Sequence, residues 1–316
     1  MLTMARLLSV EFIKSMLWTF VRFVLITGLS FIILYPILQK ISTSIKDKSD
    51  LYSPIVVWIP ENFSLDNFRQ AISIMDYWET LLNTFLLSGT TTILTTASCA
   101  IAGYAFARLK FKGSGLLFGC VILTILVPPT TILIPIYMNL KDFTLMGLIP
   151  LLTGDSVNLL DSYWPFILTS LTANSLKAGL YIFIFRQFFR GIPKVIEEAA
   201  YIDGAGIGTT FMRIMLPNAV PAIVTVMLFS FVWQWNDTFY TTTYLTSSKV
   251  MSTQLSSLPH NLAILLEGGV ATNKDPFYMS MVQDTGILLA ILPLIIIYLF
   301  VQRHFVESIE RSGIVG

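Results

Sequence analysis

The sequence is poor in charge, histidine and cysteine, and each shortage excludes a class of protein. Charged residues make up 12% of the 316 positions, about half the ~25% that is usual in soluble domains. Two histidines, His260 and His304, stand apart and outside any metal-binding pattern. Cys99 and Cys120 both lie within apolar runs, which favours free thiols over a disulfide. With a net charge of +1 and no basic patch, nucleic-acid binding is also disfavoured.

Nucleotide-binding motifs are missing as well. The chain has no GxxxxGK[ST] sequence, and Gly204-x-Gly206-x-Gly208 does not have the GxGxxG spacing. We therefore expect a chain that is not an enzyme, carries no ATPase site and binds no cofactor. Any energy-requiring process that the chain carries out must then be driven by another subunit or by an ion gradient.

Long apolar runs are what the sequence does contain, because 54% of its residues are hydrophobic. They occupy residues 17–38, 81–106, 115–138, 163–185, 214–239 and 286–302. Runs near 20 residues are long enough to cross a bilayer as helices. The sequence predicts an all-α polytopic membrane protein with about six transmembrane helices. Residues 1–22 read as an interfacial lead-in, and residues 23–316 as a single transmembrane domain.

Lysine and arginine predict the orientation of these helices. They are denser in the set of segments 1–22, 107–114, 186–213 and 303–316 than in the set 39–80, 139–162 and 240–281. The denser set is expected on the cytoplasmic side, together with both termini. The polar segment that precedes the fifth run then also faces the cytoplasm.

That polar segment, from Glu197 to Pro217, has the composition of a helical hairpin. Glutamate and alanine favour helix, whereas Asp203-Gly204 is a turn signal whose glycine accepts a positive φ. A short, structured loop between two membrane helices is a surface that another protein can hold.

The same residues resemble the EAA coupling motif of ABC importer permeases. The match comprises Glu198-Ala199-Ala200, Asp203-Gly204-Ala205 and Ile214-x-Leu216-Pro217, and the preceding residues 185–193 are similar to the carbohydrate branch, the second permease of maltose-type importers. The resemblance implies a type I ABC importer permease fold with a coupling loop at residues 186–217. It implies ATPase coupling by Glu197, Glu198, Ala199, Ala200, Asp203, Gly204, Ala205, Phe211, Leu216 and Pro217.

The resemblance also implies the binding partners and the cellular location. These are a cytoplasmic ABC ATPase dimer that binds ATP and Mg, a second homologous permease, an extracytoplasmic sugar-binding protein and the bacterial cytoplasmic membrane. The expected cargo is a sugar, with an oligosaccharide preferred, and a glycerol phosphate remains an alternative. A secondary transporter driven by an ion gradient is the other hypothesis, with Lys177 or Asp237 as the ion-coupled group.

Polar residues inside the apolar runs are candidates for the substrate path. Asn174 and Lys177 lie within the fourth run, where a lysine facing lipid would cost ~2.5 kcal/mol or more. Two interpretations stay open: a cavity lining or a break at membrane depth, and a run whose boundary places Lys177 at the outer interface.

A second polar group, at residues 233–237, closes the fifth run. Trp235 is interpreted first as an interfacial anchor, and the alternative is stacking on a sugar ring. Gln234, Asn236 and Asp237 are assigned to the substrate path with it.

Proline, a capping serine, an outer loop and the C-terminal tail add four expectations. Pro128-Pro129 and Pro135 predict a broken or strongly kinked third helix. Ser64 is placed to cap a short helix in the outer segment 39–80. The segment 240–281 is either an ordinary surface loop or, by resemblance, a contact for the binding protein. The C-terminal tail, where Val315 replaces the usual lysine, carries a weaker expectation of ATPase contact.

Overall fold

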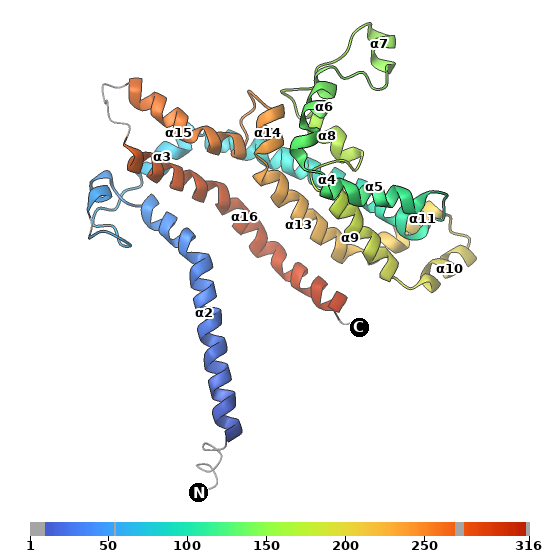
Figure 1. The fold of residues 1–316 in the computed structure, drawn as a ribbon, viewed down its shortest axis with the longest axis horizontal. Coiled ribbons are helices and arrows are strands. Elements are labelled where there is room, and N and C mark those ends of the chain that lie inside the picture. Colours follow the sequence, from blue (N-terminus) through green and yellow to red (C-terminus); the bar gives the residue numbers. More distant parts are fainter. Residues whose placement is uncertain (1–9, 54, 269–274, 314–316) are drawn as a thin grey trace. The chain divides into compact units, whose positions relative to one another are not determined.

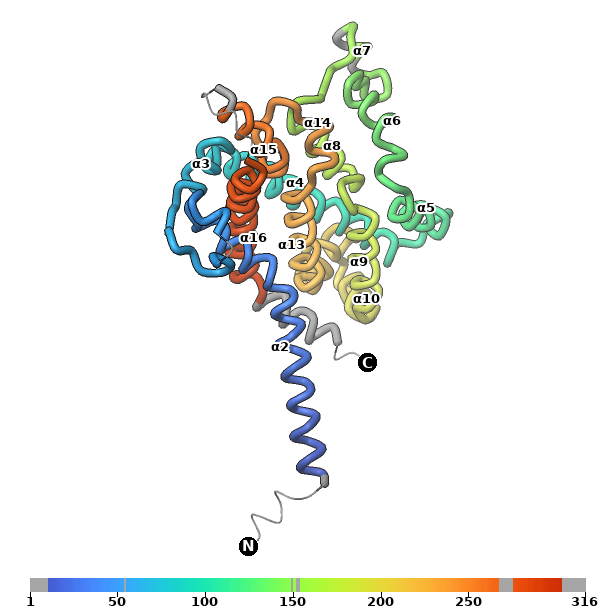
Figure 2. Tube along the Cα trace, turned by 60° about the vertical axis from the view of Figure 1, so that its left-hand side comes forward, coloured from blue at the N-terminus to red at the C-terminus, as the bar shows by residue number. Residues whose placement is uncertain are grey.

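The described part of the chain is helical (Figures 1 and 2). The computed structural model describes residues 10–53, 55–268 and 275–313. Their elements are α2 (Val10–Ser44), η1 (Lys48–Tyr52), α3 (Asp66–Ile74), α4 (Tyr77–Arg108), α5 (Ser114–Leu126), α6 (Pro129–Lys141), α7 (Leu148–Thr153), α8 (Trp164–Leu171), α9 (Ala178–Gly191), α10 (Lys194–Ile202), α11 (Ile207–Thr210), η2 (Phe211–Met215), α12 (Leu216–Asn218), α13 (Val220–Asn236), α14 (Phe239–Tyr244), α15 (Met251–Gly268) and α16 (Pro276–Gly313). The predicted all-α class is confirmed.

Two compact units make up the fold, and each is described by itself. The first comprises Met1–Ile74 and Leu258–Leu289, and the second comprises Met75–Ser257 and Ala290–Gly316. The first part of the lead-in, residues 1–9, and the end of the predicted tail, residues 314–316, lie outside the described residues.

In the first unit, α2 is an uninterrupted apolar helix. It is long and apolar enough to cross a membrane, and none of its most apolar window is buried by the rest of the chain. Apolar side chains leave water favourably, so this surface calls for lipid or for another protein.

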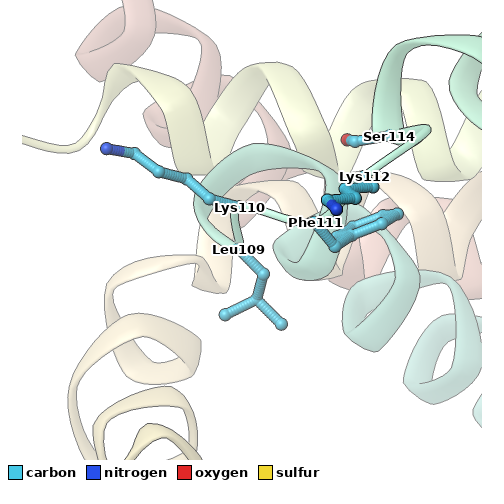
Figure 3. A pocket seen from close by; sticks show the side chains of 5 residues that line it. All are labelled: Leu109, Lys110, Phe111, Lys112 and Ser114. Carbon is cyan, nitrogen blue, oxygen red and sulfur yellow. The ribbon is translucent and has the colours of Figure 1, made fainter.

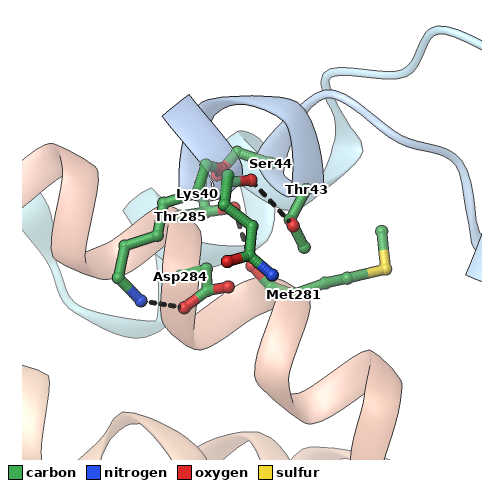
Figure 4. A network of polar contacts seen from close by, with 7 residues as sticks. Lys40, Thr43, Ser44, Met281, Asp284 and Thr285 are labelled. Atoms are coloured by element: carbon green, nitrogen blue, oxygen red, sulfur yellow. Dashed lines mark hydrogen bonds and ion pairs between the residues drawn. The ribbon is translucent and has the colours of Figure 1, made fainter. Parts of the chain in front are cut away.

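An ion pair between Lys40 and Asp284 joins the last part of α2 to α16 within the first unit (Figure 4). Nearby hydroxyls are satisfied within their own helices: Ser44 donates to the Lys40 carbonyl at 2.7 Å and Thr285 to the Met281 carbonyl at 2.8 Å. The charged pair is therefore the polar link between the two helices drawn there.

The outer segment that follows α2 is held by its own polar side chains. Asp50 accepts the Asn62 backbone N–H at 2.9 Å and the Asn62 side-chain amide at 2.8 Å. The hydroxyl of Ser64 accepts the Asp66 N–H at 3.1 Å, where α3 begins. The short helix predicted after Ser64 is thus present.

In the second unit, α4 is the central helix, because it packs against α8, α9 and α13. Its buried face is rich in small polar residues: Thr80, Thr84, Ser88, Thr91, Thr92, Thr95 and Thr96. The main hydrophobic core lies toward the other end of α4, where Tyr104 contacts Phe189 and Phe211, and Phe185 belongs to the same buried cluster. Of the two free cysteines, Cys99 is buried in this cluster and Cys120 is exposed on α5.

The predicted spans are less continuous than expected. Among the described residues, three helices are long and apolar enough to cross a membrane, and two bent helix pairs raise the number to five if each pair is one span. One bent pair is α5 with α6, at 104°, which confirms the break expected at Pro128. The other is bent by 77° between Asn218 and Val220, so the expected fifth run is divided there; α13 begins at Val220, where Pro221 fits the first turn.

The fourth expected span, 163–185, is not one helix. It is divided into α8 and α9 by residues 172–177, in which Ala173 and Lys177 have φ values of 53° and 62°. Left-handed residues cannot continue a right-handed helix, so the chain turns here. The break leaves Lys177 directly before α9, which fits both a break at membrane depth and a run boundary at the outer interface, so both interpretations of Lys177 stay predictions.

Candidate coupling site

The hairpin centres on a glycine turn after α10. The N–H of Gly204 bonds to the Tyr201 carbonyl at 3.1 Å, and the N–H of Ala205 bonds to the Ala200 carbonyl at 2.9 Å. Gly204 has φ +82°, the left-handed conformation that ends helices and that a residue with a Cβ resists. The chain then re-enters helix at Ile207, so the predicted helix, turn and helix are all present.

The second arm of the hairpin contains a π-helical turn. After α11, residues Phe211–Met215 form η2, a π-helix, and Leu216–Asn218 return to α-helix as α12. Single π turns are rare in proteins, and those that occur are often found at functional sites. Here the wider turn separates the hairpin from α13.

The ten motif residues divide into two faces. Glu197, Ala200 and Phe211 are buried, while Ala205 and Leu216 are half-buried. Exposed on the other side are Glu198, Ala199, Asp203, Gly204 and Pro217. The motif therefore has an exposed face and a buried side that attaches this face to the core. We call the buried side, formed by Glu197, Ala200 and Phe211, the root of the hairpin.

Large apolar side chains extend the exposed face. Ile202 is 86% exposed, Val195 70%, Met212 58% and Ile207 53%. These four residues flank the acidic and small residues of the motif on α10, α11 and η2. Grouped exposed apolar residues of this kind mark a site for a protein partner.

Glu197 does not belong to that face. Its carboxylate accepts a hydrogen bond from the Tyr104 hydroxyl at 3.0 Å and lies 3.1 Å from Nε of Arg108. The Arg108 and Glu197 side chains are only 7% and 8% exposed. Burial withdraws Glu197 from the exposed face, and its part in ATPase coupling stays a prediction.

Tyr104 and Arg108 were missed by sequence reasoning. They are four residues apart at the end of α4, so they lie on one side of the helix. The signal available was an arginine just after an apolar run, with a tyrosine one turn earlier. Its acidic partner stands 89 residues further along the chain, however, and nothing local names it.

Aromatic rings secure the buried side of the hairpin. Phe211 lies 4.9 Å from Tyr104 and 6.1 Å from Phe189, centroid to centroid. The Tyr104 and Phe189 rings meet edge to face at 5.6 Å. Phe211 thus acts as an anchor in the core and not as a contact for a partner.

Beside the hairpin's root, the loop after α4 forms an open hollow of about 510 Å³ (Figure 3). Its lining is Leu109, Lys110, Phe111, Lys112 and Ser114. Lys110, Phe111 and Lys112 are exposed, so this short loop presents two cations and an aromatic ring to its surroundings.

The residues assigned to the substrate path separate into two groups. Asn174 and Lys177 are exposed at the break between α8 and α9, and the Lys177 ammonium lies 4.8 Å from the centre of the Trp233 ring. A cation over an aromatic face is an attractive contact. The structure therefore brings the break to the end of α13. Asn236 is exposed there and donates to the Val232 carbonyl at 2.8 Å.

Trp235 is not an interfacial anchor. It is 2% exposed, its Nε1 donates to the Ala290 carbonyl at 3.1 Å, and its ring meets Phe85 edge to face at 5.1 Å. The anchor interpretation was wrong because the ring faces the protein core. The sugar-stacking alternative meets the same obstacle, since no face of the ring is accessible.

Gln234 and Asp237 are also buried. The Asp237 carboxylate accepts the Thr241 N–H at 2.9 Å and the Thr241 hydroxyl at 2.8 Å, which fixes the start of α14. The Asp237 carboxylate is therefore used in holding α14, whereas the Gln234 amide nitrogen is buried without a hydrogen-bond partner among the described residues.

Broken apolar helices around a central helix, with a glycine-turned hairpin exposed at one end, define a membrane permease subunit built to engage a separate protein. The chain belongs to the family of binding-protein-dependent transport system inner membrane components, whose model matches residues 99–311.

Several relatives align with nearly the whole chain. The melibiose/raffinose/stachyose import permease protein MelC of Bacillus subtilis is 26% identical over 287 residues, covering 89% of this chain and 91% of that protein. The arabinooligosaccharides transport system permease protein AraQ of Halalkalibacterium halodurans is 26% identical, covering 91% and 93%. The trehalose transport system permease protein SugB of Mycobacterium tuberculosis is 27% identical, covering 90% and 93%.

Solved structures share the fold. A chain of a bacterial ABC transporter involved in the import of the acidic polysaccharide alginate superposes with a TM-score of 0.69 at 21% identity, covering 92% of this chain and 98% of that one. A chain of the alginate transporter in complex with a pentasaccharide-bound periplasmic protein gives 0.63 at 18% identity, covering 90% and 92%. These likenesses establish the permease architecture.

Proposed function

We propose that this chain is the membrane-spanning permease subunit of an ATP-driven importer for sugars, with an oligosaccharide as the preferred cargo. The observation that carries the proposal is the hairpin of residues 194–218, which presents Glu198, Asp203 and four apolar side chains on a surface anchored in the core. Relatives named for melibiose, raffinose, arabinooligosaccharides and trehalose support the sugar class.

The hairpin is the element that meets the ATPase. Its exposed face combines acidic residues, which steer association, with apolar residues, which supply contact area. Lysines and arginines are dense in the same predicted loops, so the hairpin and both termini are placed in the cytoplasm, on the ATP side. ATP and Mg belong to the partner ATPase.

Two further partners complete the importer. A binding protein delivers the sugar on the outer side, in line with the family description and with the periplasmic protein in the alginate complex. A second permease chain shares the pathway, because α2 exposes its apolar surface and the described residues contain three helices, or five with the bent pairs, that could cross a membrane, too few to enclose a path.

The substrate path is assigned to the break between α8 and α9. Irregular backbone at membrane depth is tolerated where it lines a cavity or is covered by protein. Asn174 and Lys177 stand at this break with the Trp233 ring beside them, and these polar and aromatic groups suit a hydroxylated cargo.

Affinity purification of this chain from its native membrane in mild detergent tests the proposal. Mass spectrometry is expected to find a nucleotide-binding subunit and a second multi-span permease in the same fraction. Recovery of the chain alone, or only with its own copies, would contradict the proposal and favour a carrier driven by an ion gradient.

A further inference from the structure

A single guanidinium group joins three helices at the root of the hairpin. Arg108 is the last residue of α4, and its Nε lies 3.1 Å from the Glu197 carboxylate on α10. Its Nη2 also donates to the backbone carbonyl of Ile192, the residue that caps the end of α9. Tyr104, one turn earlier on α4, donates its hydroxyl to the same carboxylate at 3.0 Å.

The covalent link between α9 and α10 is short. Only Ile192 and Pro193 separate the two helices, with ψ of 132° and 133°. The proline ring fixes φ at Pro193 and also restricts Ile192, so this link directs the chain, but it attaches α10 to α9 alone. A connection between α10 and α4 must therefore be made by side chains.

Burial makes this ion pair costly to break, because both side chains are less than 10% exposed. The Arg108 Nε contacts the carboxylate as an ion pair outside hydrogen-bond geometry, and the hydrogen bonds at this point are those from Arg108 Nη2 to the Ile192 carbonyl and from the Tyr104 hydroxyl to Glu197. Solvent-exposed ion pairs contribute little to stability. Removing one partner of a buried pair is strongly destabilising, because the other charge is left buried without compensation. The pair between Arg69 and Asp66, 82% and 63% exposed, is the opposite case in the same chain.

We infer that Arg108 and Glu197 are positioning residues that fasten the coupling helix α10 to α4, so that movement of the hairpin is delivered directly into the central helix. This inference rests on the proposed function. Because α4 packs against α8, α9 and α13, a displacement that enters α4 reaches both sides of the break at residues 172–177.

The test measures motion of α4 in the purified complex, independently of any cargo. Trp78, which is 71% exposed at the other end of α4, is changed to cysteine in a Cys120→Ala background, and a maleimide reports its accessibility with and without ATP and vanadate. With the native pair, trapping should change the labelling rate of that cysteine. With Glu197→Gln, which keeps an acceptor for Tyr104, this response should fall about tenfold, a loss of ~1.4 kcal/mol of coupling.

Two control variants distinguish the loss of the Arg108–Glu197 link from a general destabilisation of the fold. Arg108→Met combined with Glu197→Gln removes both charges at once and avoids a buried unpaired charge; its response should match that of Glu197→Gln alone, because both changes break one interaction. Asp66→Asn, which disrupts the exposed pair with Arg69, should leave the response unchanged.

Each other result would overturn the inference. A full response in Glu197→Gln would show that the pair is not the link, and loss of the ATPase from that complex would show that the pair shapes docking. If the labelling rate in the complex with the native pair does not change on addition of ATP and vanadate, α4 does not move in response to the ATPase. Absence of any ATPase from the wild-type preparation would contradict the proposed function itself.

Discussion

Gly103 of α4 packs its backbone directly against Phe185 of α9. A Cβ at Gly103 would lie 2.5 Å from the Phe185 Cβ and 3.0 Å from the Arg186 nitrogen. Small residues allow such close approach of membrane helices. The contact lies in the same core as Tyr104, so it sets the distance between the helix that receives the hairpin's movement and the helix that leads into the hairpin.

Gly103→Ala should therefore destabilise the chain, by about 1–3 kcal/mol, the usual cost of overpacking. The measurement is the thermal midpoint of the detergent-solubilised protein, followed by size-exclusion chromatography. Gly89→Ala on the same helix is the matched control, because nothing lies within 4 Å of the added Cβ. Equal midpoints for the two variants would contradict the close packing.

Gly204→Val should abolish uptake and leave membrane insertion intact. No atom lies within 4 Å of a Cβ at Gly204, so the penalty comes from the backbone alone, at φ +82°. A left-handed residue with a side chain costs about 1–2 kcal/mol. ATP-dependent uptake into vesicles is the measurement. Gly204→Asn should retain more uptake than Gly204→Val, since asparagine tolerates this conformation, and normal uptake in the valine variant would refute the role of the turn.

Glu198→Lys should weaken association with the ATPase. Glu198 is exposed on the docking face, so the change reverses a charge without burying one. Co-purification of the ATPase at two salt concentrations measures it, and the difference from wild type should shrink at high salt as charges are screened. Asp66→Lys, an exposed acid on α3, is the control. Undiminished co-purification would contradict docking through this face.

Acid should release the loop that Asp161 holds. Its carboxylate accepts the backbone N–H groups of Thr246 and Ser247 at 3.0 and 2.9 Å and the hydroxyl of Ser247. The Ser247 hydrogen bonds hold the pKa of Asp161 below its ordinary value. Stabilisation is thus complete above the ordinary carboxyl pKa and is lost as the pH falls through the lowered one.

Hydrogen exchange at Thr246 and Ser247, corrected for intrinsic rates, is the measurement for Asp161. Protection should persist at neutral pH and disappear under strong acid, and Asp161→Asn should lack it at neutral pH. Protection that is independent of both the pH and this substitution would show that the backbone alone holds the loop.

Local chemistry explains which parts of the fold were predictable. The Asp203-Gly204 turn, the break at Pro128 and the helix after Ser64 follow from residues adjacent in sequence, and each is present. The division of residues 163–185 depends on left-handed Ala173 and Lys177, which are residue types that give no such signal.

The candidate site was predicted only in part. The motif located the hairpin, but the burial of Glu197 depends on Arg108, a partner distant in sequence. Trp235 was misjudged for the same reason: its partner is the carbonyl of Ala290, 55 residues away, and a tryptophan near the end of an apolar run looks the same whether it faces lipid or core.

The π turn at Phe211–Met215 has a consequence for the register of the chain. A π turn holds one more residue than the α turn it replaces, and each α-helical residue advances the helix by about 100°. Deleting one residue within the turn would restore an ordinary α turn and leave the direction of α11 unchanged, because the extra residue is already absorbed there. Deleting one residue from α11 would instead rotate the residues before it by that angle, the outward-facing Ile207 among them. The chain should therefore tolerate the loss of one residue better at the π turn than in α11.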